Sequence, residues 1–362
     1  MSSLTRRLFV LVAPLATLAP LAAHAGQHPV HVVLVDAGAN RAAWLERYEQ
    51  SREGPEETQT IVKTFKLTAG GSVDIFNLSG DLVVTGVAGD QISVSATKRV
   101  RGDKAKARLD DIGVTFNESP GRLEVRSALG AARNEHAGVD FEIEVPFDTL
   151  VVARTIAGDI QVSHVRGDVQ MESTSGTVEA DDTPRLIRMK TMSGDVKMTD
   201  TAATDALAAS TVSGDVEVHH VKARSIEIVS VSGDLTLIDA VCDRAQLRTV
   251  NGDVHFVGPM AKGGRYELNS HSGDIRVQPM GGGGFELSAR TFSGELRTEL
   301  PLTMAPDPAG SGDIPGLPKN RDIRGTFGDG SAMLVVRTFS GDLTLSPPDD
   351  PAHKDKPVRK KP

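Results

Sequence analysis

A row of acidic residues is the feature of this sequence that could do chemistry. Each acid follows a glycine, and the members are Asp81, Asp159, Asp168, Asp195, Asp215, Asp234, Asp253, Asp274, Glu295 and Asp342. Carboxylate oxygens are the ligands that Ca²⁺ prefers in proteins, and paired carboxylates can serve as general acid and general base. The same row fits a turn residue that recurs because the turn recurs, since a short Asp side chain accepts hydrogen bonds from nearby backbone amides.

We favour the turn interpretation and keep a cation-binding edge as the alternative. The glycine-rich nonapeptide of calcium-binding β-rolls is absent from the sequence. No acid differs from its neighbours in a way that would mark it as catalytic. The cation-binding alternative involves Asp195, Asp215, Asp234, Asp253 and Asp274.

Other residue types that bind metals or perform catalysis are few and poorly spaced. The histidines His219, His220, His255 and His271 do not form a metal-binding spacing such as H-E-x-x-H, and we interpret them as scattered surface residues. No Gly-x-Ser-x-Gly elbow, P-loop or dinucleotide fingerprint occurs in a fitting context. We therefore predict a protein that is not an enzyme and has no catalytic residues, cofactor or firm metal site.

The glycines before the acids reveal an internal repeat. The turn glycines are Gly158, Gly167, Gly176, Gly194, Gly214, Gly233, Gly252, Gly273, Gly294 and Gly341. Their successive spacings are 9, 9, 18, 20, 19, 19, 21, 21 and 47 residues. The period is thus 19–20 residues, with a half-period of nine at the start. A fixed period in this range is typical of stacked repeat architectures.

Apolar and polar residues alternate on both sides of each glycine. Around Gly233, the residues of one register are Ile226, Ile228, Ser230, Leu235 and Leu237. Alternation with a period of two predicts strands with one buried face, whereas an amphipathic helix would place apolar residues three and four apart. Glycine permits the positive φ of a tight turn, so each unit is a strand, a turn and a strand, with a second corner about ten residues later.

We predict an all-β fold, a single-stack β-solenoid of the parallel β-helix kind. One unit cannot bury its own apolar face, whereas stacked units share a continuous core. A sandwich of antiparallel hairpins is the competing interpretation. A Thr or Ser three residues before nine of the ten glycines favours the solenoid, because these residues would form an inward ladder: Thr155, Ser173, Thr191, Thr211, Ser230, Thr249, Ser270, Thr291 and Thr338.

The N-terminus predicts export. Thr5-Arg6-Arg7 precedes an apolar run from Leu8 to Ala23, and Ala23-His24-Ala25 follows as a cleavage site. This is the pattern of a secretory signal peptide cut after Ala25, by the Sec route or, alternatively, by the twin-arginine route. No later segment is apolar for long enough to span a bilayer as a helix. We expect the mature chain in the periplasm or at the cell surface, and these two locations remain open.

The predicted domain organisation follows from these signals. It comprises a signal peptide (1–25), an extension with a short helix at Arg41–Arg52 (26–60), an irregular β-rich cap (61–150), the solenoid repeats (151–346) with a Pro/Gly-rich loop (301–324), and a disordered tail (347–362).

The net charge and the composition limit the classes of partner that we expect. The chain has a formal net charge of −8, and removal of 1–25 takes away two arginines and lowers it to −10. Such a surface does not favour nucleic acid. With Cys242 as the only cysteine, no intrachain disulfide can form. We expect a protein or glycan of the envelope as partner, and we also consider self-association through the end coils.

Several segments resemble the DUF4097 family of bacterial adhesin-like proteins. They are Glu57-Thr58-Gln59-Thr60, Asn77-Leu78-Ser79-Gly80-Asp81-Leu82, Thr97-Lys98-Arg99-Val100, Val145-Pro146-Phe147 and the serial Ser-Gly-Asp-Val units. The resemblance covers residues 57–346 and implies an envelope or secreted β-solenoid. It supplies no catalytic residues.

Three functions are compatible with these observations. The first is a non-catalytic envelope protein that binds a partner or acts as a scaffold through its strand faces. The second is a periplasmic accessory of envelope stress or signalling. The third is a polysaccharide-active enzyme, which would need sugar-stacking aromatics and a paired acid and base, whereas the chain has one Trp and two Tyr. We favour the first.

Overall fold

The computed structural model describes residues 56–348, apart from 68–69, 102–104, 131–135, 282 and 305–320. The chain divides into two compact units, Met1–Arg47 and Tyr48–Pro362, and all described residues belong to the second. The predicted signal peptide, the helix at 41–52 and the tail from 349 onward lie outside the described residues. In the described part nearly every element is a strand, and a short helix, α2, spans Ala105–Leu109.

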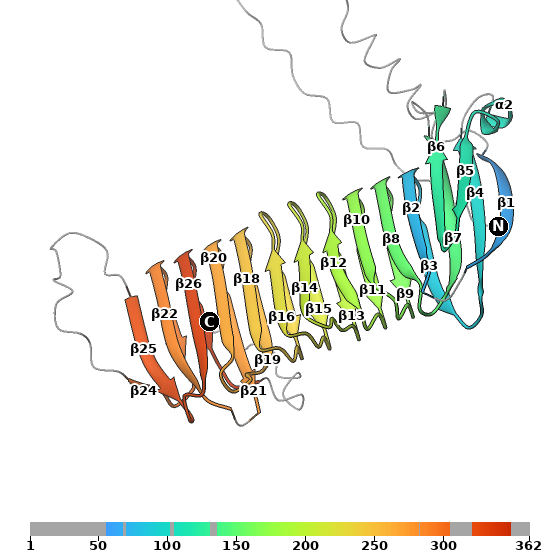
Figure 1. Cartoon of the computed structure of the whole chain (residues 1–362). Helices are drawn as coiled ribbons and strands as arrows, with labels where there is room; N and C mark the ends of the chain where they lie inside the picture. The colour runs from blue at the N-terminus through green and yellow to red at the C-terminus, as the bar shows by residue number, and fades with distance from the viewer. Residues whose placement is uncertain are drawn as a thin grey trace, which may run out of the picture. The chain divides into compact units, whose positions relative to one another are not determined.

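The strands form two sheets (Figure 1). The thirteen-stranded sheet contains, in spatial order, β1 (Glu56–Lys66), β4 (Gln91–Arg101), β7 (His136–Pro146), β3 (Leu82–Val87), β9 (Ile160–Ser163), β11 (Val178–Asp181), β13 (Val196–Thr199), β15 (Val216–His219), β17 (Leu235–Ile238), β19 (Val254–Pro259), β21 (Ile275–Met280), β27 (Leu343–Leu345) and β23 (Leu296–Thr298).

The fourteen-stranded sheet contains β24 (Thr303–Met304), β25 (Arg321–Phe327), β22 (Phe285–Ser293), β26 (Ala332–Ser340), β20 (Arg265–Ser272), β18 (Arg244–Asn251), β16 (Ser225–Val229), β14 (Ala206–Ser210), β12 (Leu186–Lys190), β10 (Val169–Ser175), β8 (Leu150–Ala157), β2 (Ser72–Ser79), β6 (Arg122–Ala128) and β5 (Gly113–Ser119).

From β6 to β24, successive strands along the chain alternate between the two sheets, so each repeat forms one coil with a strand in each sheet. In the central coils every pairing is parallel. Val216 of β15 pairs with Leu235 of β17, and Leu207 of β14 pairs with Ile226 of β16. Parallel pairing between units one period apart confirms the predicted solenoid, because a sandwich of hairpins would pair adjacent strands in antiparallel fashion.

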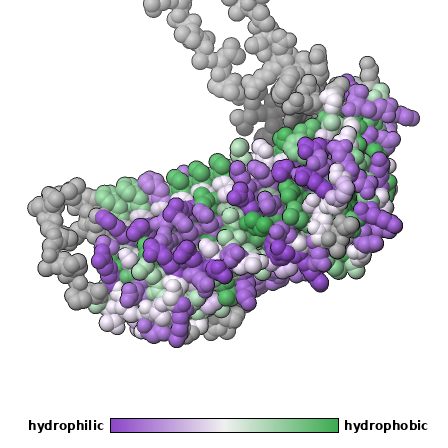
Figure 2. All heavy atoms as spheres, viewed as in Figure 1, coloured by the Kyte–Doolittle hydropathy of each residue, from purple (hydrophilic) through white to green (hydrophobic). Residues whose placement is uncertain are grey.

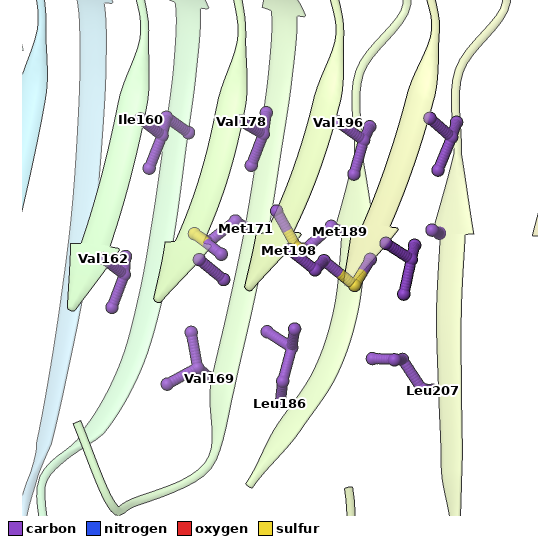
Figure 3. Packing of buried hydrophobic residues seen from close by; sticks show 14 of the residues in the cluster. Ile160, Val162, Val169, Met171, Val178, Leu186, Met189, Val196, Met198 and Leu207 are labelled. Carbon is purple, nitrogen blue, oxygen red and sulfur yellow. The ribbon is translucent and has the colours of Figure 1, made fainter. Parts of the chain in front are cut away.

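The core lies between the two sheets and consists of the alternate residues that the period-2 pattern predicts. Val178 and Val196 from one sheet point toward Val169 and Leu186 from the other (Figure 3). All four side chains are fully buried. Burial of one such side chain stabilises the fold by about 1.5–3 kcal/mol, so a stack of similar coils gains this contribution repeatedly.

The predicted ladder of Thr and Ser residues three positions before nine of the turn glycines is also confirmed. All nine are at most 7% exposed. Most of their hydroxyls donate a hydrogen bond to the carbonyl of the turn glycine in the neighbouring coil, as Thr191 does to Gly176 (3.0 Å) and Thr211 to Gly194 (3.0 Å). The buried hydroxyls thus join one coil to the next.

At both ends the coils are not stacked in chain order. The coil β2–β3 lies between β6–β7 and β8–β9, although the latter two are consecutive in the sequence. At the other end, β26–β27 lies between β20–β21 and β22–β23. The last coil of the chain is therefore held between two earlier coils.

The order of the coils adds detail to the predicted segments. Within 61–150, which was predicted as an irregular cap, β2–β3 and β6–β7 form coils, and Asn77 to Asp81 provide the turn of the first. The final unit, which contains Gly341, lies between the coils of Gly273 and Gly294. The predicted loop at 301–324 also contains β24 and the start of β25, which pair with each other in antiparallel fashion.

Antiparallel strands flank the coils at both ends. At the N-terminal end, β4 pairs with β7, β1 pairs with β4, and β5 pairs with β6. At the C-terminal end, β25 pairs with β22. Among the described residues, none of the helical segments is long and apolar enough to cross a membrane.

Candidate functional site

The corner that carries the glycine and the acid, termed the Gly-Asp corner, allows only glycine. Gly214 and Gly233 both have φ of +147°. A Cβ atom added at Gly233 would lie 1.9 Å from the carbonyl oxygen of Gly214. Neighbouring coils therefore contact each other through bare backbone at this corner, which accounts for the recurrence of glycine.

The structure places Asp195, Asp215, Asp234, Asp253 and Asp274 in one row along the Gly-Asp corner. Each carboxylate accepts a hydrogen bond from the backbone N–H of the equivalent acid in the next coil. The N–H to Oδ1 distances are 2.9 Å for Asp215 to Asp195, 2.8 Å for Asp234 to Asp215, 2.8 Å for Asp253 to Asp234, and 2.7 Å for Asp274 to Asp253. The carboxylates thus satisfy backbone donors that the turn exposes, as expected of a turn residue.

Asp168 does not belong to this row, contrary to the sequence interpretation. It lies before β10, at the corner on the other side of the coil, and forms an ion pair with Arg185 at 2.7 Å. Thr177 follows the corner glycine Gly176 instead, and its N–H donates to Asp159 at 2.7 Å. The apparent half-period of nine arises because Gly167 marks this other corner.

The row also continues out of chain order. The N–H of Asp342 donates to Asp274 at 2.8 Å, and that of Glu295 donates to Asp342 at 2.8 Å. In the part of the chain that the structure describes, no group of three or more His, Cys, Asp or Glu side chains could hold a metal ion. The cation-binding edge remains a prediction.

The histidines lie at three separate places. His255 bonds to Gln278 at 3.0 Å, and His271 stacks on Phe339 with ring centroids 5.0 Å apart. His220, next to His219, lies 3.4 Å from Asp200 and 3.5 Å from Asp239.

Cys242 cannot serve as a nucleophile at neutral pH. Its side chain is buried, and burial raises the pKa of the thiol to about 12. The thiol therefore stays protonated, whereas the thiolate is the reactive form. The hydroxyl of Tyr266 donates a hydrogen bond to the Cys242 carbonyl at 2.7 Å, and its own pKa is also raised to about 12 by burial.

A strip of exposed apolar side chains was missed in the sequence. These residues stand two positions before seven of the corner glycines and point outward from the fourteen-stranded sheet, whereas Thr174 and His271 occupy the same position before Gly176 and Gly273. The seven apolar residues form what we term the apolar ridge: Ile156, Met192, Val212, Val231, Val250, Phe339 and Phe292, each 39–55% exposed. The signal was the recurrence of apolar residues at a position that the period-2 pattern assigns to solvent. Apolar side chains also lie among polar ones on the face seen in Figure 2.

The ridge ends in aromatic rings beside a hollow. Phe292 stacks on Phe339 with centroids 4.8 Å apart. A hollow of about 500 Å³ adjoins them and is also lined by Asn269, Arg290 and Arg337. A second hollow of about 410 Å³ lies further along the same strands. We term the first hollow, which Arg290 and Arg337 line, the arginine hollow.

The stack of parallel coils with a Gly-Asp corner defines a β-solenoid repeat protein. Residues 184–346 match the model of the Toastrack DUF4097 family. The resemblance seen in the sequence is thereby confirmed. The match covers the central and C-terminal coils.

Solved structures and curated proteins complete the comparison. A structure described as a "putative adhesin" of Bacteroides fragilis NCTC 9343 is 10% identical, with 79% of this chain and 97% of that chain covered and a TM-score of 0.38. A "putative lipid binding protein" of Parabacteroides distasonis ATCC 8503 is 11% identical, with 79% and 96% covered and a TM-score of 0.39. A "putative cell adhesion protein" of Clostridium sporogenes ATCC 15579 is 8% identical, with 80% and 99% covered and a TM-score of 0.20. No curated protein matches the chain.

Proposed function

We propose that this protein is a non-catalytic binding module of the bacterial cell envelope, exported and then anchored to a partner through the outer face of its solenoid. The apolar ridge is the observation that carries this proposal. Met192, Val212, Val231 and Val250 come from four consecutive coils, which are stacked about 4.8 Å apart, so they form a continuous strip. Thr174 separates this strip from Ile156, and His271 separates it from Phe339 and Phe292. Monomeric proteins rarely leave a continuous apolar patch uncovered unless it binds something.

The exposure of the ridge contrasts with that of the residues directly before it. Val212 is 47% exposed and Val231 is 44% exposed, whereas their neighbours Thr211 and Ser230 are 3% and 2% exposed. These two coils therefore keep a hydroxyl inside and a large apolar side chain outside. A solenoid that only needed a soluble surface would place polar residues at the outer position.

Location is tested by fractionation of the native bacterium and protease treatment of intact cells. We expect the mature chain, cut after Ala25, in the envelope fraction. Cleavage on intact cells would indicate surface display and adhesion, and protection until the outer layer is opened would indicate a periplasmic scaffold. Recovery of the uncut chain from the cytoplasm would contradict the proposal.

Binding through the ridge is tested by co-sedimentation of the purified mature chain with isolated cell envelopes. In the Val212→Lys/Val231→Lys variant, two charges interrupt the strip, and we expect at least a tenfold loss of retention. The matched control, Gln161→Lys/Thr236→Lys, adds the same charges to the thirteen-stranded sheet and should be retained like the wild type. Equal retention of both variants would show that the ridge is not the binding surface.

A further inference from the structure

The arginine hollow brings together two positive charges that form no ion pair. Arg290 of β22 and Arg337 of β26 are register partners on adjacent parallel strands, and Asn269 of β20 is the next partner in the same row. Both arginines are exposed. Like charges directly opposite each other on a sheet are destabilising, so this arrangement has a cost that the fold does not require.

Two other basic residues of the same row are paired with acids elsewhere in the solenoid. Lys190 contacts Glu172 at 3.6 Å, and Arg154 contacts Asp74 at 3.5 Å. Among the described residues, neither Arg290 nor Arg337 forms an ion pair. Asp322 lies opposite Arg290 on β25, and the structure shows no ion pair between them. The hollow is thus a local positive site on a chain of net charge −8.

The same hollow presents apolar ring surface beside the two guanidinium groups. Phe292 and Phe339 are 39% and 48% exposed and line the hollow together with Arg290 and Arg337. Residues two apart on a strand face the same side, so the second hollow, which includes Ser288, continues the first along the outer face. A bound molecule can therefore extend from one hollow into the next.

We propose that the arginine hollow binds the carboxylates of an acidic polysaccharide, that is, a glycan chain containing uronate sugars. The planar guanidinium groups of Arg290 and Arg337 match the geometry of a carboxylate. The phenylalanine rings offer apolar surface to the C–H groups of a sugar ring, and the Asn269 amide can both donate and accept hydrogen bonds with hydroxyls. This inference rests on the proposed binding function and names the ligand class for one end of the same outer face.

Two other ligand classes fit the hollow less well. A lipid acyl chain gains affinity only where it is removed from water, and the hollows are open depressions rather than an enclosed tunnel. A nucleic acid requires a long row of cationic residues along its phosphates, and the acidic row at the Gly-Asp corner opposes it. A glycan needs neither full enclosure nor an extended basic surface.

The test uses the purified mature chain and an oligogalacturonate of about six sugars, with binding measured by isothermal titration calorimetry. We expect saturable binding that weakens with added salt, and at least a tenfold loss of affinity in the Arg290→Ala/Arg337→Ala variant. Removal of two exposed charges from a strained row leaves the fold intact, which thermal unfolding verifies. Phe292→Ala should weaken binding about fivefold. The matched control is Arg188→Ala, an exposed arginine on β12 outside the hollows, which should bind within twofold of the wild type.

Control ligands decide between charge, sugar and lipid. The carboxyl-reduced, neutral oligosaccharide should bind at least tenfold more weakly. Equal binding of polyglutamate would overturn the proposal in favour of simple charge attraction. Binding of anionic phospholipid vesicles through Arg290 and Arg337, without binding of the oligogalacturonate, would overturn it in favour of a lipid. Loss of envelope retention in the ridge variant but not in the arginine variant would leave the proposed function standing and refute the glycan.

Discussion

The two corners of a coil turn the chain with different residue types and different backbone conformations. At the Gly-Asp corner, the glycines have φ between +137° and +157° from Gly158 onward, and every coil uses glycine there. At the opposite corner of five coils the chain turns through a left-handed residue that is not glycine, with φ of +46° to +59°: His164, Asp182, Asp200, His220 and Asp239. Both corners need a positive φ, yet only one of them leaves a repeating motif in the sequence.

The difference lies in the space around each corner and in the region of φ. Values near +50° lie in the left-handed helical region, which Asp, Asn and His can adopt at moderate cost. Values near +147° belong to a region that is almost restricted to glycine, and the carbonyl of the neighbouring coil also excludes a Cβ atom. A repeat motif is therefore conspicuous where the backbone permits one residue type, and weak where it permits several.

The largest effect in this comparison is expected when a glycine at the Gly-Asp corner is replaced by alanine, which adds a Cβ methyl group. In Gly233→Ala, the new Cβ would meet the Gly214 carbonyl and φ would be strained, so we expect a loss of about 3–5 kcal/mol in the free energy of unfolding. The control is Gly263→Ala, where φ is +72° but no atom lies within 4 Å, and which should cost only about 1 kcal/mol. Urea denaturation measures both. Equal losses would show that strain alone, and not contact between coils, requires glycine.

The hydroxyl ladder next to the Gly-Asp corner offers a second test. Thr191→Val removes a buried hydrogen bond to Gly176 and leaves the carbonyl unsatisfied, so we expect a loss of about 1–2 kcal/mol. Thr155→Val should be neutral or stabilising, because the Thr155 hydroxyl has no partner among the described residues. The carbonyl of Gly80, the turn glycine of the neighbouring coil β2–β3, already accepts a hydrogen bond from Asn77 at 2.8 Å. A similar loss in both variants would contradict a role for the hydrogen bond.

Substitutions in the row of acids at the Gly-Asp corner should have a smaller effect on the free energy of unfolding. Asp215→Ala removes the acceptor for the N–H of Asp234, and because this site is exposed we expect a loss of only about 1 kcal/mol. Asp215→Asn retains an acceptor and removes a repulsive charge, so its stability should equal that of the wild type. Thermal unfolding in millimolar Ca²⁺ should match that in NaCl of equal ionic strength. A Ca²⁺-specific rise in Tm that Asp234→Asn abolishes would establish the cation-binding edge.

Substitutions at the opposite corner should change the free energy of unfolding least. Asp182 has φ of +46° and an exposed side chain. Asp182→Gly fits this conformation without strain and should change stability by at most about 0.5 kcal/mol, whereas Asp182→Val should cost about 1–2 kcal/mol because a β-branched residue disfavours positive φ. Chemical denaturation distinguishes the two. A large loss in Asp182→Gly would mean that the Asp side chain, and not its backbone conformation, matters at this corner.

Much of the fold follows from local sequence because its signals repeat. Ile226 and Leu235 could be assigned to the core from alternation, and the Thr and Ser ladder could be assigned from its constant distance to the glycine. The order of the end coils could not. All coils carry the same strand and turn signals, so nothing local states that Gly341 lies between Gly273 and Gly294 rather than beyond Gly294.

The arginine hollow was hidden for the same reason. Arg290 and Arg337 are 47 residues apart, more than twice the period of the central repeats, so the repeat spacing does not predict that they are register partners. Stacking in chain order would place Arg290 beside Asn269, whereas the structure places Arg337 there. The apolar ridge, in contrast, was visible as a recurring position, but alternation alone assigns that position to solvent and says nothing about its residue type.

The inserted coils at both ends have a consequence for the ancestry of the molecule. A copy of a central repeat can be added or deleted between β10 and β19, since each coil there is bordered by its predecessor and its successor. A copy appended after the last strand would find no free place, because β26–β27 is already enclosed by coils on both sides. Gene duplication can therefore lengthen the middle of this solenoid, whereas the groups of coils at its two ends do not admit an added repeat.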